Sequence, residues 1–252
     1  MTDSAKPSNS KKAYTTIFED EAILVINKPA GLLTIADRYD KEAPNLRNIL
    51  NDEYQHIFVV HRLDRDTSGI MVFAKNAEAH KILNEQFENL EVGKIYHVVC
   101  DGVVFKDEVE INIPLMPDPR KPGKTIPSAR GKESLSILKV KERYRHATYG
   151  EIDLITGRHH QIRVHLSAIG HPLLVDDLYG KATEFNLSQI KRRYNIKKND
   201  TERPIISRIT MHAYSLQFKH PVSGETVQYE AEYPKDFRAL IEVLNKYGLK
   251  RG

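Results

Sequence analysis

Cysteine is nearly absent from this chain of 252 residues, which contains only Cys100. A lone cysteine cannot form an internal disulfide, so the sequence fits a reducing compartment. Cys100 lies in the apolar run 96–104, where a buried and inert thiol is the default. Asp101 and Gly102 follow it and offer no cation to stabilise a thiolate, so nucleophilic use of Cys100 is disfavoured.

Long apolar segments are also missing, because no run approaches the length of a transmembrane helix. The first 13 residues are polar and lack the apolar stretch of a secretory signal, so we expect a disordered tail and a cytoplasmic protein without membrane contact. Residues 14–252 are then expected to form one catalytic domain. Hydrophobic residues make up 40% and charged residues 29%, a composition typical of a globular protein.

No dominating charge is present, since 38 basic residues face 34 acidic ones and leave a net charge of +4. Positive charge is concentrated locally, in the Pro/Gly-rich stretch 114–132 and in the polar insert 181–208. The basic residues of the first stretch are Arg120, Lys121, Lys124, Arg130 and Lys132. Such clusters are candidate phosphate contacts, although a solvated surface explains either one taken alone. We predict that 114–132 is an RNA-contacting arm.

Alternating and continuous apolar runs predict strands at 15–18, 22–27, 94–104, 134–141 and 146–155, and a hairpin from 209–218 to 226–231. Helical spacing predicts a helix over 77–90 capped by Asn76, another from Arg158 to Gly170, and a terminal helix opened by Pro234. Many strands with few helices predict an α+β fold around a central mixed, mainly antiparallel sheet flanked by helices.

The most informative segment is residues 61–69, which read His-Arg-Leu-Asp-Arg-Asp-Thr-Ser-Gly between two apolar runs. Asp64 stands between Arg62 and Arg65 on an expected loop, and a carboxylate paired with arginine stays ionised and can act as a nucleophile. A bland alternative is equally open from these residues alone: Asp64 caps the turn and pairs on a solvated surface. Turn capping also explains Asp66.

This segment resembles the central motif of the RluA-type pseudouridine synthases, His-Arg-Leu-Asp, two variable residues, then Thr-Ser-Gly, and every fixed position is present. The resemblance extends along most of the chain, through segments 24–31, 94–96, 156–166, 170–180, 212–213 and 220–225. One departure is His159, which stands where the family usually has Thr.

The resemblance implies a catalytic role for three residues. The family's catalytic aspartate falls on Asp64, the arginine that is ion-paired to it falls on Arg163, and a tyrosine that packs on the target base and helps to remove its C5 proton falls on Tyr96. An arginine partner would lower the pKa of Asp64. Without the resemblance, Tyr96 is explained by the core and Arg163 by a helix surface.

Three more residues are expected to contact RNA or to assist base flipping. Arg62 matches the arginine that the family uses to extrude the base, and Arg158 and His160 lie beside the same predicted helix as Arg163. Extrusion is required because a side chain cannot reach C1′ or C6 of a stacked uridine. We therefore expect a cofactor-independent RNA pseudouridine synthase that acts as a monomer on structured rRNA or tRNA. Many relatives carry a separate N-terminal RNA-binding domain, and we expect none here because the polar tail is too short to hold it.

Three rival functions are weighed against it. A glycoside or nucleoside hydrolase needs a second, suitably placed carboxylate, and Asp64 and Asp66 face opposite ways if the segment is extended. A zinc enzyme built on His159, His160 and His165 lacks the usual ligand spacing, so no metal is expected. A module that binds RNA without chemistry shares every basic feature of the chain.

Overall fold

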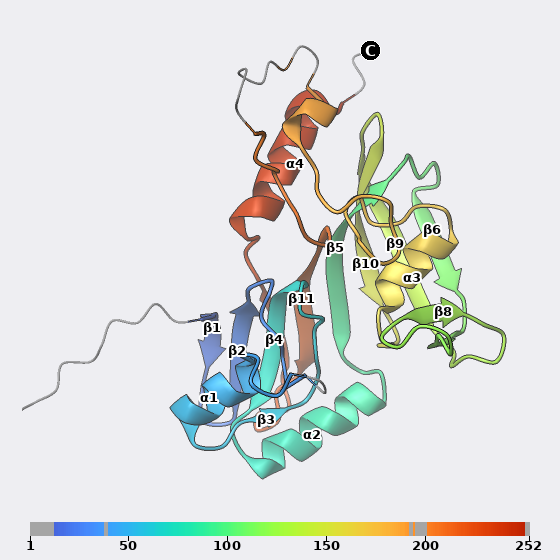
Figure 1. Ribbon diagram of the computed structural model, residues 1–252. Helices are drawn as coiled ribbons and strands as arrows, with labels where there is room; N and C mark the ends of the chain where they lie inside the picture. The colour runs from blue at the N-terminus through green and yellow to red at the C-terminus, as the bar shows by residue number, and fades with distance from the viewer. Residues whose placement is uncertain (1–12, 38–39, 192–193, 195–200, 250–252) are drawn as a thin grey trace, which may run out of the picture.

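A ten-stranded sheet runs through the computed structural model, which describes residues 13–37, 40–191, 194 and 201–249. Its order is β1-β2-β4-β11-β5-β10-β9-β6, with β3 paired to β4 and β12 paired to β11, and β7 and β8 form a separate two-stranded sheet (Figure 1). The strands are β1 (Thr15–Glu19), β2 (Ile23–Lys28), β3 (Phe58–Val59), β4 (Ser68–Ala74), β5 (Gly93–Asp101), β6 (Glu108–Asn112), β7 (Leu115–Pro117), β8 (Thr125–Pro127), β9 (Leu135–Arg143), β10 (Ala147–Leu154), β11 (Met211–Lys219) and β12 (Thr226–Glu230).

Four α-helices and one short 3₁₀ helix complete the described residues. They are α1 (Leu46–Tyr54), α2 (Ala77–Glu88), α3 (Gln161–Ala168), η1 (Leu187–Gln189) and α4 (Lys235–Tyr247). Figure 1 shows α1 and α2 near one end of the sheet, α4 at the opposite end, and α3 beside β8. The α+β prediction is confirmed, and no described helix has both the length and the apolar character needed to cross a membrane.

The sheet is mixed because of one parallel pair among the described strands, β4 with β11. Gly69 lies in this pair at φ +125°, and a Cβ there would stand 2.1 Å from the backbone oxygen of Ala213. Only glycine permits so close an approach at that backbone angle. Beside it, the hydroxyl of Ser68 contacts Nδ1 of His212 at 2.9 Å. The Gly of the central motif therefore joins the start of β4 to β11.

Apolar packing divides into three clusters of buried residues. The first gathers β2, β4 and α1, the second lies among β5, β10 and α3, and the third packs α4 onto Val99 and Ala147. Tyr96 packs against both of the first two. Its position in β5 thus places it where the two larger parts of the core meet.

Some elements differ from the sequence prediction. Helix α1 and strand β6 are not predicted, and the expected loop 114–132 contains the small sheet of β7 and β8. The helix expected from Arg158 begins at Gln161. In the insert 181–208, η1 is the one described helix, and residues 192–193 and 195–200 lie outside the described part, as do residues 1–12 of the predicted tail.

Candidate active site

Asp64 lies on the loop between β3 and β4, as the sequence predicts. The turn closes when the backbone N–H of Thr67 donates to the carbonyl of Asp64 at 3.1 Å. The Asp64 side chain keeps 28% of its surface exposed, whereas Asp66 is exposed on the same loop. The loop thus directs one carboxylate inward and the other to solvent.

Buried Lys28, the last residue of β2, anchors this loop. Its Nζ donates to three backbone carbonyls at 2.7 to 3.0 Å, those of Pro29, Leu32 and Arg65. Burial lowers the pKa of Lys28 to about 7, against the charges of Asp66 and Asp64. On the other side of Asp64, the Thr34 hydroxyl donates to the Leu63 carbonyl and accepts from its N–H. Asp64 is therefore held between two backbone anchors.

His160 approaches Asp64 from the start of α3. It occupies the position before the helix in a left-handed backbone conformation, with φ +54°. Its Nδ1 lies 2.9 Å from the Tyr179 hydroxyl, and its Nε2 lies 3.7 Å from Oδ2 of Asp64. Burial, with help from the charge of Arg163, lowers the pKa of His160 to about 3, so the ring is neutral at physiological pH. Its hydrogen bond to Tyr179 fixes its orientation.

Arg163, one turn into α3, forms its ion pair with Asp176 and not with Asp64. Its Nε and Nη2 each donate to a carboxylate oxygen of Asp176 at 2.7 Å, a bidentate pair, and Nη2 reaches Asp177 at 3.4 Å. Nη1 donates to Nε2 of His160 at 3.3 Å. The predicted Arg163–Asp64 ion pair is therefore wrong: Asp176, whose side chain is fully buried, takes the guanidinium fork with both oxygens.

The pKa of Asp64 is raised, which corrects the expectation of a lowered one. Burial is the largest cause and raises it, while the charges of Arg163 and Lys28 act in the opposite direction without overcoming it. The neighbouring Asp176 carboxylate adds to the increase. Because a protein interior disfavours an unpaired anion, the carboxylate is destabilised and therefore a better nucleophile than a paired one.

Tyr96 on β5 lies within the electrostatic reach of Asp64. Burial raises the pKa of its phenol, and the charge of Asp64 raises it further. The side chain is partly buried in β5. Tyr96 is thus a neutral phenol beside the carboxylate in the free protein.

The structure brings together Asp64, Tyr96, His160 and Arg163, which we call the Asp64 cluster. The other two predicted residues lie around it. Arg62 is exposed next to Asp64, and Arg158 is exposed with its Nε donating to the carbonyl of Glu133. Neither forms an ion pair with Asp64 among the described residues.

Sequence reasoning missed the roles of Lys28, Asp176 and Tyr179. Each lies in a segment that carries the family resemblance, but nothing in those segments names a partner. The pattern that marks Asp176 is an acidic pair directly after the apolar run Leu173–Val175, in which Leu173 and Val175 are buried. Such a position buries a carboxylate, and a buried carboxylate requires a cation.

Asp64, His159 and His160 could each turn a ligand atom toward a metal, since three such atoms lie within 4.8 Å of one another. Two features disfavour a cation there. The Arg163 guanidinium already donates to Nε2 of His160, and the two imidazole rings are stacked with centroids 3.7 Å apart. His165 points elsewhere, with Nε2 3.0 Å from the Ile113 carbonyl. The arrangement of these three side chains therefore does not favour a metal ion.

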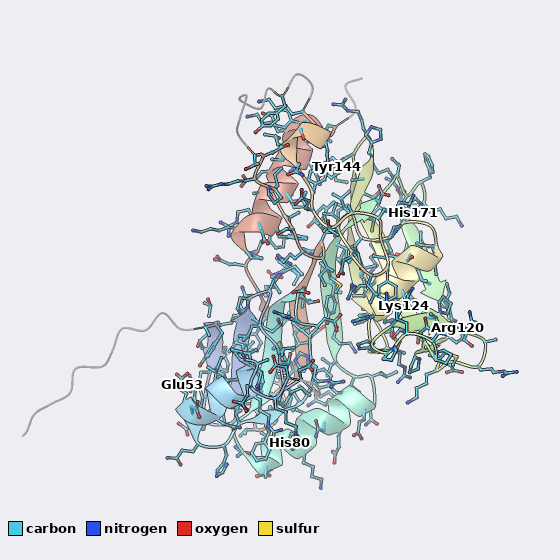
Figure 2. All side chains as sticks on the ribbon, viewed as in Figure 1. Glu53, His80, Arg120, Lys124, Tyr144 and His171 are labelled. Carbon is cyan, nitrogen blue, oxygen red and sulfur yellow. The ribbon has the colours of Figure 1, made fainter. Side chains whose placement is uncertain are left out.

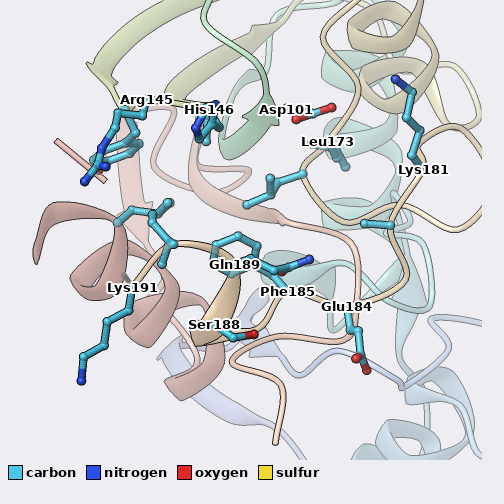
Figure 3. Close-up of a pocket in the computed structure, with 16 residues that line it drawn as sticks. Asp101, Arg145, His146, Leu173, Lys181, Glu184, Phe185, Ser188, Gln189 and Lys191 are labelled. Carbon is cyan, nitrogen blue, oxygen red and sulfur yellow. The ribbon is translucent and has the colours of Figure 1, made fainter. Parts of the chain in front are cut away.

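A cavity of about 470 Å³ lies away from the Asp64 cluster (Figure 3). It is bordered by α4, η1 and the segment between Leu173 and Glu184, and basic side chains such as Arg145 and Lys191 stand at its edge. None of the six predicted site residues lines it. The Asp64 cluster therefore lies outside this cavity.

Comparison with known proteins agrees with the geometry. A family model described as RNA pseudouridylate synthase matches residues 22–168. The dual-specificity RNA pseudouridine synthase RluA of Vibrio vulnificus is 36% identical over 82% of this chain and 78% of its own length. The ribosomal large subunit pseudouridine synthase D of Neisseria meningitidis is 35% identical over 92% of this chain but only 61% of its own length.

The fold also matches a solved structure. Human RNA pseudouridylate synthase domain containing 1 superposes with a TM-score of 0.67 at 24% identity, covering 92% of this chain and 87% of that one. This likeness concerns the fold alone. The family model and the relatives in bacteria show that the chain belongs to the RNA pseudouridine synthases of the RluA type, a family of isomerases.

Proposed function

We propose that this chain converts specific uridines of structured rRNA or tRNA into pseudouridine, with Asp64 as the nucleophile. One observation carries the proposal. Asp64 is a half-buried carboxylate with a raised pKa and no arginine ion pair, and it stands beside a fixed cation, Arg163, and a phenol, Tyr96. That combination suits attack on an electrophilic carbon of a nucleotide.

The reaction is an isomerisation, so atoms balance without a cofactor. The bond between N1 and C1′ breaks, a bond between C5 and C1′ forms, and the proton on C5 moves to N1. In our proposal the Asp64 carboxylate attacks the nucleotide and is released unchanged at the end. Arg163 stabilises negative charge that develops on the base, because its position is fixed by Asp176 before substrate arrives.

Tyr96 is proposed to accept or relay the C5 proton. In the free protein the phenol is protonated and so cannot accept this proton, since both burial and the Asp64 charge raise its pKa. Once Asp64 has formed a covalent bond, its negative charge is gone and one of these two causes is removed. The phenol would then ionise more readily, which times its basicity to the later step.

Arg62 is proposed to fill the stack that an extruded uridine leaves. Its side chain is exposed beside Asp64 and free to enter RNA. A planar guanidinium can stack on bases and also contact phosphate, which a lysine does less well. Arg158 and His160 lie just before α3 and would contact the flipped nucleotide or its phosphates.

The substrate class rests on the relatives. One is named for the large ribosomal subunit and another for dual specificity, which supports rRNA as the first RNA to examine and tRNA as the second. We further propose that the protein acts in the cytoplasm as a monomer, without a resident metal.

The experiment is to incubate purified protein, without added metal or nucleotide, with total rRNA and tRNA from cells that lack the gene. Pseudouridine is then mapped by carbodiimide-dependent stops of reverse transcription. We expect new stops at one or a few uridines with wild type and none with Asp64→Asn. If wild type yields no new stop on either RNA class, the alternative of an RNA-binding module without chemistry replaces this proposal.

A further inference from the structure

Thr125 links the small sheet of β7 and β8 to the active site by hydrogen bonds. We call residues 114–132 the basic hairpin. Thr125 is buried at the start of β8; its backbone N–H donates to the Tyr179 hydroxyl at 2.8 Å, and its own hydroxyl lies 3.0 Å from Nδ1 of His159. The hairpin is thus bonded to two side chains that border the Asp64 cluster.

Tyr179 connects this attachment to the catalytic side chains. Its hydroxyl, which accepts from Thr125, also lies 2.9 Å from Nδ1 of His160. Its ring lies under the Arg163 guanidinium, 5.0 Å from the centroid, and Lys124 of the hairpin stands 5.6 Å from the same centroid. A shift of the hairpin would therefore move Tyr179, which contacts both His160 and Arg163.

The outer part of the hairpin carries positive charge. Arg120, Lys121, Arg130 and Lys132 are exposed, and Figure 2 shows Arg120 and Lys124 on the hairpin on the side of the molecule where α3 lies. Exposed lysines and arginines on a narrow projection fit the phosphate backbone of RNA.

His159 is the side chain that distinguishes this attachment. Its ring stacks on His160 with centroids 3.7 Å apart and an angle of 24°, so it contacts both the hairpin and the Asp64 cluster. A threonine at this position would have neither the reach of an imidazole nor a ring to stack. The bond to Thr125 therefore depends on the histidine side chain.

We propose that His159 and Thr125 couple RNA binding on the basic hairpin to the position of His160 and Arg163 at Asp64. The inference rests on the proposed function and deepens it. His159 is a positioning residue: it reaches the reaction through His160 and the hairpin. RNA phosphates bound to the hairpin would hold it in place. The two hydrogen bonds of Thr125 then orient His159 and Tyr179, and these two side chains orient His160 and Arg163.

The test compares two substrates that contain the same uridine, identified first with wild type. One is the full-length structured RNA, and the other is the isolated target stem-loop, too short to reach the hairpin. The readout is the ratio of the single-turnover rates at saturating enzyme, long over short. We expect a ratio above one for wild type, reduced about fivefold by Thr125→Val or His159→Thr, the scale of one lost hydrogen bond.

Two further variants sharpen the test. The double variant Thr125→Val/His159→Thr is expected to lose no more than the worse single variant, because both remove the same bond. His159→Asn, whose amide can stand where Nδ1 stands, is expected to restore most of the ratio. As a matched control, Lys81→Ala on the exposed face of α2 is expected to leave the ratio unchanged, since it removes a lysine charge away from the hairpin.

Each other result overturns the inference. A merely structural role for either residue would slow both RNAs equally and leave the ratio unchanged. Losses that multiply in the double variant would mean that the two side chains act separately. A wild-type ratio of one would mean that the hairpin does not contribute to the rate. Failure of wild type on every RNA would instead refute the proposed function, so the two failures are distinguishable.

Discussion

Two groups of residues border Asp64, which we call the loop wall and the helix wall, and the cation of each has a different kind of partner. The loop wall consists of the loop between β3 and β4 and of Lys28 at the end of β2. The Lys28 ammonium donates to three backbone carbonyls, and no described lysine or arginine forms an ion pair with Asp64. On the helix wall, at the start of α3, Arg163 is paired with Asp176 through two bonds of 2.7 Å.

The difference separates the reactive group from the fixed ones. Since Asp176 already pairs with Arg163, the cation stays in place; its charge lowers the pKa of Asp64, but burial, the largest cause, raises that pKa above its usual value. Had Arg163 paired with Asp64 instead, the carboxylate would be stabilised and less reactive. Because Arg163 is paired with Asp176 on the helix wall, the Asp64 carboxylate on the loop wall stays unpaired and able to react.

The largest expected effect comes from removing the reactive charge. Asp64→Asn keeps the size of the side chain and deletes the anion, so turnover should fall by roughly three orders of magnitude or more while RNA binding is largely kept. Single-turnover kinetics and filter binding measure the two quantities. Asp66→Asn, on the exposed side of the same loop, is the matched control and should stay near wild type. Turnover near wild type in Asp64→Asn would remove Asp64 from the chemistry.

Sequence alone places one wall better than the other. Asp64 and its loop are predictable because the motif stands between two apolar runs that become β3 and β4, and Asn76 signals the start of α2 by its cap. The partner of Arg163 is not predictable, since Asp176 is 13 residues away and the pairing depends on how the chain folds back after α3. The prediction that the pKa of Asp64 is lowered is wrong for a related reason: neighbouring arginines can be read from the sequence, but burial cannot.

The missed fold elements have a similar cause. Helix α1 buries only Leu46 and Leu50, so most of its sequence is polar and reads as a loop. Strand β6 has charged residues at Glu108 and Glu110, and only Ile111 is buried. Both elements are stabilised by their neighbours and not by a strong local pattern, and tertiary packing decides such segments.

The second prediction removes the charged partner of Arg163 on the helix wall. Asp176→Asn removes one partner of a buried ion pair and should cost about 3 to 5 kcal/mol of unfolding free energy, measured by chemical denaturation. Arg163 also loses its fixed orientation, so the saturated rate should fall by about ten- to a hundredfold. Because the Asp176 charge helps to raise the pKa of Asp64, its removal should move the acid limb of the pH–rate profile to lower pH.

The control for this variant is its neighbour. Asp177→Asn touches the same guanidinium at 3.4 Å, but the Asp177 side chain is 75% exposed. It should cost less than about 1 kcal/mol and leave the pH profile in place. Equal effects of the two variants, or an acid limb of Asp176→Asn that moves to higher pH, would show that the bidentate pair does not organise the wall.

The smallest expected effect comes from the loop wall, with Lys28→Met. The variant fits the space but deletes three bonds to backbone carbonyls, so the loop that carries Asp64 should shift and the saturated rate should fall by about tenfold. Lys28 also lowers the pKa of Asp64 through its charge. Removing that charge disfavours the carboxylate anion, so the pKa rises and the acid limb of the rate profile moves to higher pH, opposite to Asp176→Asn.

This opposite shift is the sharper part of the test, because a general loss of structure would not move two acid limbs in different directions. Lys81→Met on the exposed face of α2 controls for the loss of a lysine charge and should leave both rate and pH profile near wild type. If Lys28→Met moves the limb to lower pH, or leaves it in place while the rate falls, the ammonium acts on the loop's position alone. The charge of the loop wall would then have no part in setting the Asp64 carboxylate.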